Sequence, residues 1–283
     1  MRCAVVVTGA SRGFGRCLAL NFARELATSD LDLARRSVPS SGRLRVFTRP
    51  VDLSDSADYT TKVDALLIQL TSGAERHDRV FLVHNAGALG GLGFAQECPS
   101  PSVMARHFEL NVTSVMWLNK RFLDVFGREV TTSSINAIRS ELTVSQADVL
   151  TPRLVIMNVS SRSAIAPYPT LSQYCTAKAA REMHFRVLAL EQSGCHCNGN
   201  CNKEEVAVLS YSPGAMDTDM QKTMRESPLM APQLAKWFND MKEQGTLVPT
   251  EKSSRRGVVA AIRGAFESGK YVTFDELSFI DEP

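Results

Sequence analysis

The sequence has no hydrophobic run as long as a membrane span requires. A helix needs about 20 consecutive apolar residues to cross the hydrocarbon core of a bilayer, and runs such as CAVVV at residues 3–7 are far shorter. This first run also lacks the longer apolar core of a secretory signal peptide. We therefore expect a cytoplasmic protein with no membrane association.

Net charge is also small. The 283 residues include 32 Lys and Arg and 30 Asp and Glu, which gives a formal net charge of +2. Nucleic-acid-binding domains usually carry a strongly basic patch or stripe, and the arginine pairs at 35–36 and 255–256 are too short to form one. We expect no nucleic-acid partner, whereas a small anionic ligand is compatible with this charge.

A disulfide framework is not expected either. The seven cysteines are an odd number in a chain large enough to bury a full hydrophobic core, which favours reduced thiols. Cys195, Cys197 and Cys201 form one metal-like cluster. Because this cluster lacks a distant second pair of ligands and is surrounded by Gly and Asn residues, we predict a flexible surface insertion and no metal site.

The sequence does contain an alternation of short β-branched runs and helical segments. With 44% hydrophobic residues, it predicts one α/β domain over residues 1–283, a Rossmann-type doubly wound parallel sheet of about seven strands with helices on both faces. Strands are expected at residues 3–7, 31–34, 44–48, 80–84, 154–159, 206–211 and 271–274. Helices are expected at about residues 14–27, 54–70, 103–126 and from residue 173, with a helical substrate lid near 220–250.

The predicted fold is abbreviated after its first helix. Only residues 36–43 separate the second and third expected strands, and they include Pro39 and Gly42. A segment this short cannot hold a full crossover helix, so the register of Arg35 stays open. Two insertions are expected near residues 127–151 and 194–204, the first with a possible extra helix at 135–149.

A glycine-rich turn, TGASRGFG at residues 8–15, follows the first strand directly. Gly9, Gly13 and Gly15 would let the backbone turn tightly and approach a diphosphate, while the next helix would direct its free N–H groups and positive dipole end at that charge. The spacing differs from G-x-G-x-x-G, so ordinary turn-forming glycines are an equal alternative.

Further segments at expected strand ends fit parts of a dinucleotide. Arg12, Arg35 and Arg36 could meet a ribose 2′-phosphate and favour NADP over NAD, or they could be solvated surface arginines. The Asp52-Leu53 pair could bond an adenine amino group or simply begin a helix. Residues 85–87, Asn-Ala-Gly, would let a nucleotide lie close over the strand end, or form an ordinary turn.

The stretch from residue 161 to 178 offers a hydroxyl, a phenol and an ammonium. Ser161 follows an expected strand, and Tyr174 and Lys178 lie four residues apart, which places them one turn apart on one helix face. A nearby ammonium favours the phenolate and so lowers the pKa of a tyrosine. Asn111, inside an otherwise apolar helix, could hold a water beside Lys178 or be an ordinary polar residue.

These motifs occur in the order found in the short-chain dehydrogenase/reductase family, which the sequence resembles. Within that family it is most similar to the sepiapterin reductase group, through SRGFGR at 11–16, YCTAKAAR at 174–181 and SPGAMDTDMQ at 212–221. The resemblance implies NADPH-dependent reduction of a ketone on a pterin side chain. It assigns catalytic roles to Tyr174 as proton donor, Ser161 as carbonyl ligand, Lys178 as ribose ligand and Asn111 as holder of a relay water.

The resemblance also implies two further sets of residues and a homodimer packed through the Asn111 and Tyr174 helices. The cofactor-binding residues implied are Gly9, Ala10, Ser11, Arg12, Gly13, Phe14, Gly15, Arg35, Arg36, Asp52, Leu53, Asn85, Ala86, Gly87, Lys178, Met216, Asp217, Thr218, Asp219, Met220 and Gln221. Thr218 would bond the nicotinamide carboxamide. The substrate-binding residues implied are Ser161, Tyr174, Gly214 and Asp275.

Several positions depart from the sepiapterin reductase pattern. Thr273 stands where that group carries a substrate-anchoring aspartate, and Asp275, expected on the same strand face, is the candidate to replace it. His84 stands in place of an asparagine. A general NADPH-dependent carbonyl or diketone reductase is therefore an alternative function, and a catalytically idle dinucleotide-binding module is a second.

Overall fold

Aliphatic and β-branched runs form the sheet of this protein. The computed structural model describes residues 1–34, 44–72, 77–97, 100–127, 153–193 and 206–281. Within them, the strands are β1 (Cys3–Val7), β2 (Arg79–His84), β3 (Leu154–Val159), β4 (Val206–Ser212) and β5 (Tyr271–Thr273), and they lie side by side in that order. All pairs are parallel, so the carboxyl ends of the strands share one edge of the sheet.

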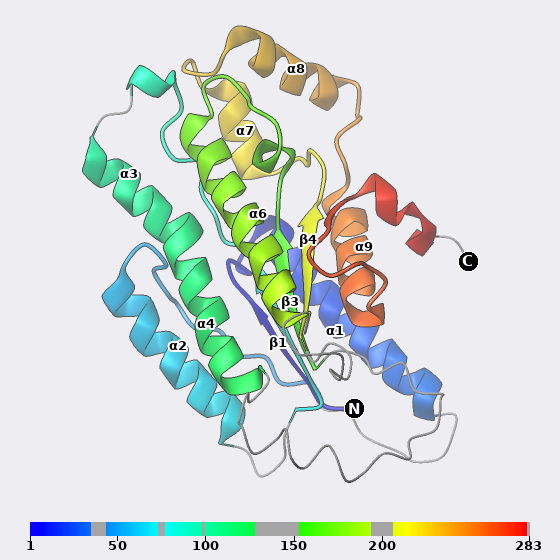
Figure 1. Cartoon of the computed structure of the whole chain (residues 1–283). Coiled ribbons are helices and arrows are strands. Elements are labelled where there is room, and N and C mark those ends of the chain that lie inside the picture. Colours follow the sequence, from blue (N-terminus) through cyan, green and yellow to red (C-terminus); the bar gives the residue numbers. More distant parts are fainter. Residues whose placement is uncertain (35–43, 73–76, 98–99, 128–152, 194–205, 282–283) are drawn as a thin grey trace.

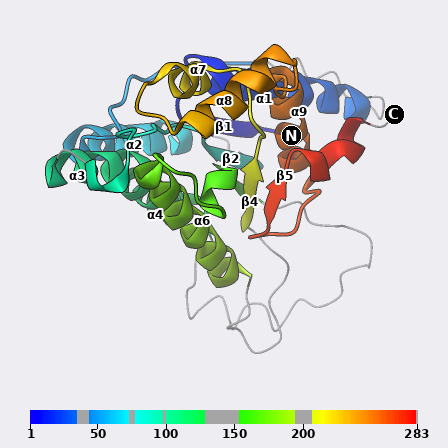
Figure 2. The same ribbon diagram turned by 90° about the horizontal axis from the view of Figure 1, so that it is seen from above.

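Helices cover both faces of this sheet (Figures 1 and 2). On one face, α1 (Gly13–Ala34) and α9 (Thr250–Arg263) pack on a core that includes Phe22 and Val258. On the other, α2 (Ser56–Thr71), α4 (Ser114–Phe126) and α6 (Ser172–Gln192) pack on a second core. Every residue of β2, β3 and β4 is buried, as expected for parallel strands covered on both sides. The predicted Rossmann-type fold is confirmed.

The second and third predicted strands are wrong. Residues 31–34 continue helix α1 to Ala34, because Leu and Ala favour a helix and residues 16–38 contain no Gly or Pro. Residues 44–48 have no regular structure. Leu44, Val46 and Phe47 are 67%, 75% and 70% exposed, and none of the strands in the described sheet pairs with them. The described sheet therefore has five strands where about seven were predicted.

The predicted helix at 103–126 is divided. It forms α3 (Pro101–Phe108), the π-helical turn η2 (Glu109–Thr113) and α4. Above the carboxyl ends of the strands lie α7 (Asp219–Glu226) and α8 (Pro232–Glu243), the two helices of the predicted lid (Figure 1). Three short 3-10 turns complete the described chain: η1 (Ala95–Glu97), η3 (Arg162–Ala164) and η4 (Asp275–Asp281).

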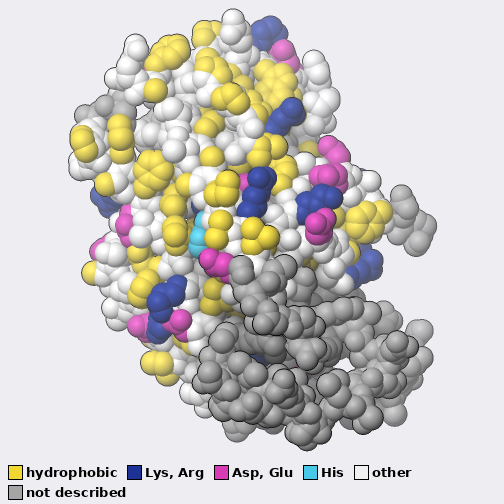
Figure 3. Space-filling view, viewed as in Figure 1, with side chains coloured by type: hydrophobic (Ala, Val, Ile, Leu, Met, Phe, Trp, Pro, Cys, Tyr) yellow, Lys and Arg dark blue, Asp and Glu magenta, His cyan; other side chains and the backbone are white. Residues whose placement is uncertain are grey.

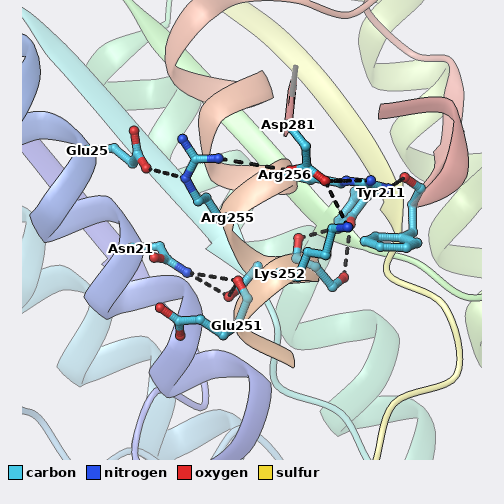
Figure 4. Close-up of polar contacts among 11 residues, drawn as sticks. Asn21, Glu25, Tyr211, Glu251, Lys252, Arg255, Arg256 and Asp281 are labelled. Carbon is cyan, nitrogen blue, oxygen red and sulfur yellow. Dashed lines mark hydrogen bonds and ion pairs between the residues drawn. The ribbon is translucent and has the colours of Figure 1, made fainter. Parts of the chain in front are cut away.

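Helix α9, which the sequence analysis did not predict, is fixed by polar contacts on both sides (Figure 4). Arg255 reaches Glu25 of α1 at 2.9 Å, and Arg256 donates to Asp281 at 2.9 and 2.6 Å. The Ser253 hydroxyl donates to the carbonyl oxygen of Pro213 at 2.8 Å. These contacts hold both the loop after β4 and the chain after β5 at the edge where the strands end.

Several predictions lie outside the described residues. They concern Arg35 and Arg36, the cysteine cluster at 195–201, the insertion at 194–204 and nearly all of the insertion at 127–151. Within the described ranges, no helix is long and apolar enough to span a membrane.

Candidate active site

The turn after β1 is locked to the turn after β2. The Asn85 side-chain amide donates to the carbonyl oxygens of Thr8 (3.0 Å) and Gly9 (3.2 Å). In return, the Thr8 hydroxyl accepts from the backbone N–H groups of Asn85 (3.1 Å) and Ala86 (3.0 Å). A Cβ atom at Gly15 would lie 2.3 Å from both the Asn85 amide nitrogen and the Gly9 oxygen. Only glycine fits there, and four predicted cofactor residues meet at this point.

The outer side of the glycine-rich turn is open to solvent. Gly9 and Gly13 have φ angles of 67° and 53°, which favour glycine, and Ser11, Arg12 and Gly13 are exposed. Because α1 begins at Gly13, its first N–H groups are directed toward this turn, where the positive end of the helix dipole favours an anion. Phe14 points the other way, into the core beneath α1.

Arg12 is paired across the site with the lid. Its guanidinium lies 2.7 Å from the carboxylate of Asp219, and the two side chains are 79% and 75% exposed. The glycine-rich turn and the first turn of α7, both predicted to bind cofactor, therefore face each other. An exposed pair like this one contributes at most about 1 kcal/mol, so Arg12 can leave Asp219 for another anion.

Asp52 and Leu53 lie in an irregular turn before α2, not at a strand end. Asp52 accepts hydrogen bonds from the Ser54 hydroxyl (2.7 Å) and the Ser54 N–H (2.8 Å), and these bonds hold the pKa of Asp52 below its usual value. Asp55 then caps α2 by accepting from Ala57 N–H. Asp52 is exposed, so its contact with an adenine stays a prediction.

Asn111 is fully committed to protein contacts. Within η2, its amide oxygen accepts from Ala88 N–H at 3.1 Å, and its amide nitrogen donates to the His107 carbonyl at 3.0 Å. The same nitrogen lies 3.2 Å from His107 Nδ1, and His107 Nε2 lies 3.2 Å from the Gln173 carbonyl. A neutral ring with its proton on Nε2 satisfies both contacts, and burial lowers the pKa of His107, which favours that form. Asn111 thus ties η2 to the loop after β2.

Ser161, Tyr174 and Lys178 converge beside the end of β3. The Ser161 hydroxyl and the Tyr174 phenol are hydrogen-bonded, and the Lys178 ammonium lies 5.6 Å from the centre of the Tyr174 ring. Lys178 also donates to the Val159 carbonyl at 2.8 Å. The three side chains come from the β3–η3 turn and one face of α6, as the spacing predicted.

The expectation that Lys178 lowers the pKa of Tyr174 is wrong for the protein without ligand. Burial raises the pKa of Tyr174 more than the Ser161 hydrogen bond and the Arg181 charge lower it. Burial also lowers the pKa of Lys178 well below its usual value. Both changes have the same physical cause, since neither side chain reaches water to solvate its charged form.

A buried polar network beneath the site was not predicted. The Arg181 guanidinium donates to the carbonyl oxygens of His84 (2.8 Å) and Ala86 (3.1 Å) and to the Asn158 side-chain oxygen (2.9 Å). Arg181 is 1% exposed, and burial lowers its pKa to about 10. The signal for it was the repeat of polar residues at 174, 178, 181 and 182 on one helix face.

The lid is held by its own polar contacts. Asp217 pairs with Arg225 of α7 at 3.2 Å and with Lys242 of α8. The Thr218 hydroxyl caps α7 by accepting from Gln221 N–H, and the buried Gln221 amide donates to the Phe238 carbonyl at 3.5 Å. Of the residues predicted to bind cofactor here, Asp217 and Gln221 are thus engaged within the lid.

The lid also contacts the loop before α6 and the loop after β4. The Thr170 hydroxyl accepts from Ala231 N–H at 3.1 Å, and Thr170 has a positive φ of 65°, a strained backbone for a residue other than glycine. Met216 forms an isolated bridge with Val248, and a Cβ at Gly214 would lie 2.8 Å from a Val248 methyl. The chain from residue 213 therefore needs glycine to pass beneath the lid.

The premise that placed Asp275 on the strand face of Thr273 is wrong. Strand β5 ends at Thr273, and Asp275 begins the 3-10 turn η4, so the alternation of side chains along a strand no longer applies. The tight turn instead brings Glu276 back, and its carboxylate accepts from the Thr273 hydroxyl (2.7 Å) and N–H (2.8 Å). Thr273 is paired with Ser212 at the carboxyl end of β4.

Comparison with known proteins identifies the family. The model of the short chain dehydrogenase family matches residues 3–146 and 151–229. This chain is a short-chain dehydrogenase/reductase. It is 32% identical to the sepiapterin reductase of Meriones unguiculatus over 96% of both chains. It is 27% identical to the benzil reductase ((S)-benzoin forming) of Bacillus subtilis (strain 168) over 86% of both. The solved structure of the KRED1-Pglu enzyme superposes with a TM-score of 0.69 and 25% identity, covering 96% of this chain and 100% of that one.

Members of this family are oxidoreductases that act on carbonyl or alcohol groups with a nicotinamide dinucleotide, and this short-chain dehydrogenase/reductase is such an enzyme. Its residues fit that cofactor. The close approach at Gly15 and the positive φ angles at Gly9 and Gly13 leave the turn after β1 without side chains that would block a diphosphate.

Apolar side chains surround the reacting end of this short-chain dehydrogenase/reductase. Tyr174 belongs to a cluster that joins α6 to the lid, and its buried members are Leu89, Leu171, Tyr174, Met230, Ala231, Leu234 and Phe238. Partly buried residues extend it, among them Tyr168, Met220 and Met224. Methionines adapt their shape to what packs against them, and the side chains around Tyr174 are mainly apolar.

Proposed function

We propose that this enzyme uses NADPH to reduce a ketone on the side chain of a pterin. The observation that carries the proposal is the convergence of Ser161, Tyr174 and Lys178 at the end of β3, where Tyr174 also belongs to the apolar cluster. The similarity to sepiapterin reductases over nearly the whole chain supports the pterin.

The bound cofactor would supply the hydride. Tyr174 would give its phenolic proton to the substrate oxygen, and the Ser161 hydroxyl would hold that oxygen in place. The phenolate left on Tyr174 would be stabilised by the Lys178 ammonium and the buried Arg181 charge. Asn111 would keep η2 against the loop after β2 and so fix the wall beside Lys178.

The preference for NADP rests on arginines near the glycine-rich turn. Arg12 is exposed and bound to Asp219 through a weak ion pair. A ribose 2′-phosphate carries more negative charge than the carboxylate and accepts bidentate hydrogen bonds from a guanidinium. We propose that it replaces Asp219 as the partner of Arg12, with Arg35 and Arg36 as further candidates from the sequence.

Reduction of an apolar diketone is the second candidate. The cluster around Tyr174 is apolar, and Thr273 cannot supply the carboxylate with which sepiapterin reductases anchor the ring. The similarity to a benzil reductase points the same way. The third alternative, an idle binding module, is disfavoured because the catalytic side chains converge.

We also propose a homodimer packed through the α4 and α6 helices. Met183, Val187 and Leu190 form an exposed stripe on α6, at 59%, 43% and 65% exposure, and Met116 on α4 is 45% exposed. Hydrophobic side chains are visible across this face in Figure 3.

A cytosolic location of the protein stays a prediction.

A substrate panel tests the function. NADPH oxidation would be followed with sepiapterin, benzil and a small aliphatic diketone under identical conditions. The proposal predicts the highest kcat/KM for sepiapterin. A higher value for benzil would favour the second candidate, and no oxidation with any carbonyl compound would contradict both.

A further inference from the structure

Helix α6 buries two more charged side chains one turn beyond Lys178. Lys178, Arg181 and Glu182 are 5%, 1% and 3% exposed. Positions 174, 178 and 182 recur every four residues and so share one helix face. Two cations and one anion therefore lie buried within about one turn of α6, on the side of the helix that carries Tyr174.

The carboxylate of Glu182 is held at the sheet. One of its oxygens accepts from the Ser160 hydroxyl at 2.7 Å and from the Ser210 hydroxyl at 2.6 Å. Ser160 follows β3 and precedes Ser161, and Ser210 lies in β4. These two hydroxyl donors fix the position of the carboxylate between β3 and β4. The other oxygen is 3.4 Å from Nε of Arg186, whose side chain is 45% exposed.

Among the residues that the structure describes, the Arg181 guanidinium donates to backbone carbonyls and to Asn158, and it makes no ion pair with a carboxylate. A guanidinium keeps its proton in proteins. If Glu182 were neutral, two buried cations would remain within one helical turn, and burying unpaired charges is strongly unfavourable. Of the two buried cations, Lys178 and Arg181, only Lys178 can release a proton.

We propose that Glu182 is a positioning residue of the reaction, the counter-ion that keeps Lys178 protonated beside Arg181. This inference rests on the proposed function, because the Lys178 ammonium serves Tyr174 during reduction. The charge of Glu182 raises the pKa of Lys178, and it opposes the lowering by burial and by Arg181.

Other titratable groups facing α6 do not replace this carboxylate. Burial lowers the pKa of His84 to about 3 and also lowers the pKa of His107, so both are neutral. Burial raises the pKa of Tyr271, which is neutral as well. The Glu109 carboxylate accepts from the Tyr59 hydroxyl at 2.5 Å, and Arg162 of η3 is exposed.

An NMR titration of the cofactor-free protein tests the proposal. Lysine labelled with ¹³C at the ε position reports protonation, and K178R identifies the Lys178 signal. In E182Q the midpoint of Lys178 should fall by about one pH unit or more, because a carboxylate one turn away is lost at low effective dielectric. The pH at which kcat declines on the alkaline side should fall by the same amount.

E191Q is the matched control, because Glu191 is exposed near the end of the same helix. It removes the same charge and should leave the Lys178 midpoint unchanged. The variants E182D and E182N compare a charged with a neutral side chain at position 182, both one methylene shorter than Glu. The Lys178 midpoint should stay near the wild-type value in E182D and fall in E182N.

A Lys178 midpoint equal in E182Q and wild type would overturn the proposal, and so would failure of both neutral variants to fold. The titration needs no substrate, so it can fail while the enzyme still reduces ketones. Conversely, the midpoint can shift in a protein that reduces no pterin, which would count against the proposed function alone.

Discussion

Tyr174 keeps its proton in the ligand-free enzyme, and this follows from where α6 places it. Burial raises the pKa of the phenol, while the Ser161 hydroxyl and the Arg181 charge favour its ionisation. A phenol in this balance holds a proton at neutral pH and releases it when negative charge develops on a bonded oxygen. The four-residue spacing was sufficient to predict the Tyr174–Lys178 pair, but the burial that raises the pKa of Tyr174 also depends on packing against the lid.

At the substrate end, the two candidate carboxylates can be separated by substitution. Glu276 reaches Thr273 at the end of β5, whereas Asp275 begins the turn beyond it. We expect E276Q to raise KM for sepiapterin about tenfold, equivalent to about 1.4 kcal/mol, because a carboxylate accepts two ring donors and an amide does not. D275N is the control and should leave KM nearly unchanged.

Steady-state kinetics with sepiapterin and a small diketone would check this, since the diketone has no ring donors and should be reduced equally by both variants. A larger effect of D275N than of E276Q would return the anchoring role to Asp275. Equal effects on both substrates would make these carboxylates structural.

The proposed preference for NADP depends on Arg12. R12A should weaken NADPH binding by one charge-assisted hydrogen bond, roughly 1.5–3 kcal/mol, and leave NADH binding almost unchanged. D219N keeps the guanidinium but removes its carboxylate partner, so it should bind NADPH at least as tightly as the wild type. Calorimetric titration with both cofactors would measure this, and equal weakening of NADPH and NADH in R12A would mean that Arg12 does not touch the 2′-phosphate.

Among the structural elements, the sequence predicted best those whose pattern is contained within a single strand, turn or helix. The buried runs of β2, β3 and β4 and the turn at Gly9 to Gly15 have this local character. Residues 44–48 show the opposite case, because a strand pattern there has no partner once residues 31–34 continue α1. Helix α9, which includes Arg256 and Gly257, was not predicted. Its burial depends on contacts with α1 and with the C-terminal turn η4, which lie far from it in the sequence.

Gly15 tests the fit between β1, α1 and the loop after β2. In G15A the new Cβ would lie 2.3 Å from the Gly9 carbonyl oxygen, a backbone atom, so the turn must move. We expect the Kd for NADPH to rise about tenfold or more. G257A is the control: its Cβ would lie 2.8 Å from a methyl of Met157, which should destabilise the core by about 1–3 kcal/mol without changing NADPH affinity.

Fluorescence titration of NADPH together with thermal melting would distinguish these variants. Unchanged NADPH affinity in G15A would show that the glycine-rich turn does not bind the cofactor. A loss of affinity in G257A equal to that in G15A would attribute both effects to general unfolding.

For the whole molecule, His84 makes stability depend on pH. Its folded pKa is about 3 against 6.5 for the free side chain, chiefly through burial and then through Arg181. Between these two pKa values the unfolded state binds more protons than the folded state. The contribution of neutral His84 to the free energy of unfolding is therefore fully present above pH 6.5 and falls as the pH decreases. At about pH 5 the loss amounts to roughly 2 kcal/mol.

H84N removes this titration and should reduce the difference in unfolding free energy between about pH 7.5 and pH 5 by that roughly 2 kcal/mol. Chemical denaturation at both pH values would measure it, whatever the absolute stability of the variant. An unchanged difference would mean that His84 is not held neutral in the folded protein.

In the proposed reaction, Tyr174 gives its proton to the reduced substrate while other residues hold the cofactor. The most direct measurement compares Tyr174→Phe with the wild type in NADPH binding and in turnover of the best carbonyl substrate. We predict nearly equal Kd values and a loss of about 10²–10⁴-fold in kcat, the usual contribution of a positioned acid. A variant that keeps more than about a tenth of the wild-type kcat would contradict this assignment.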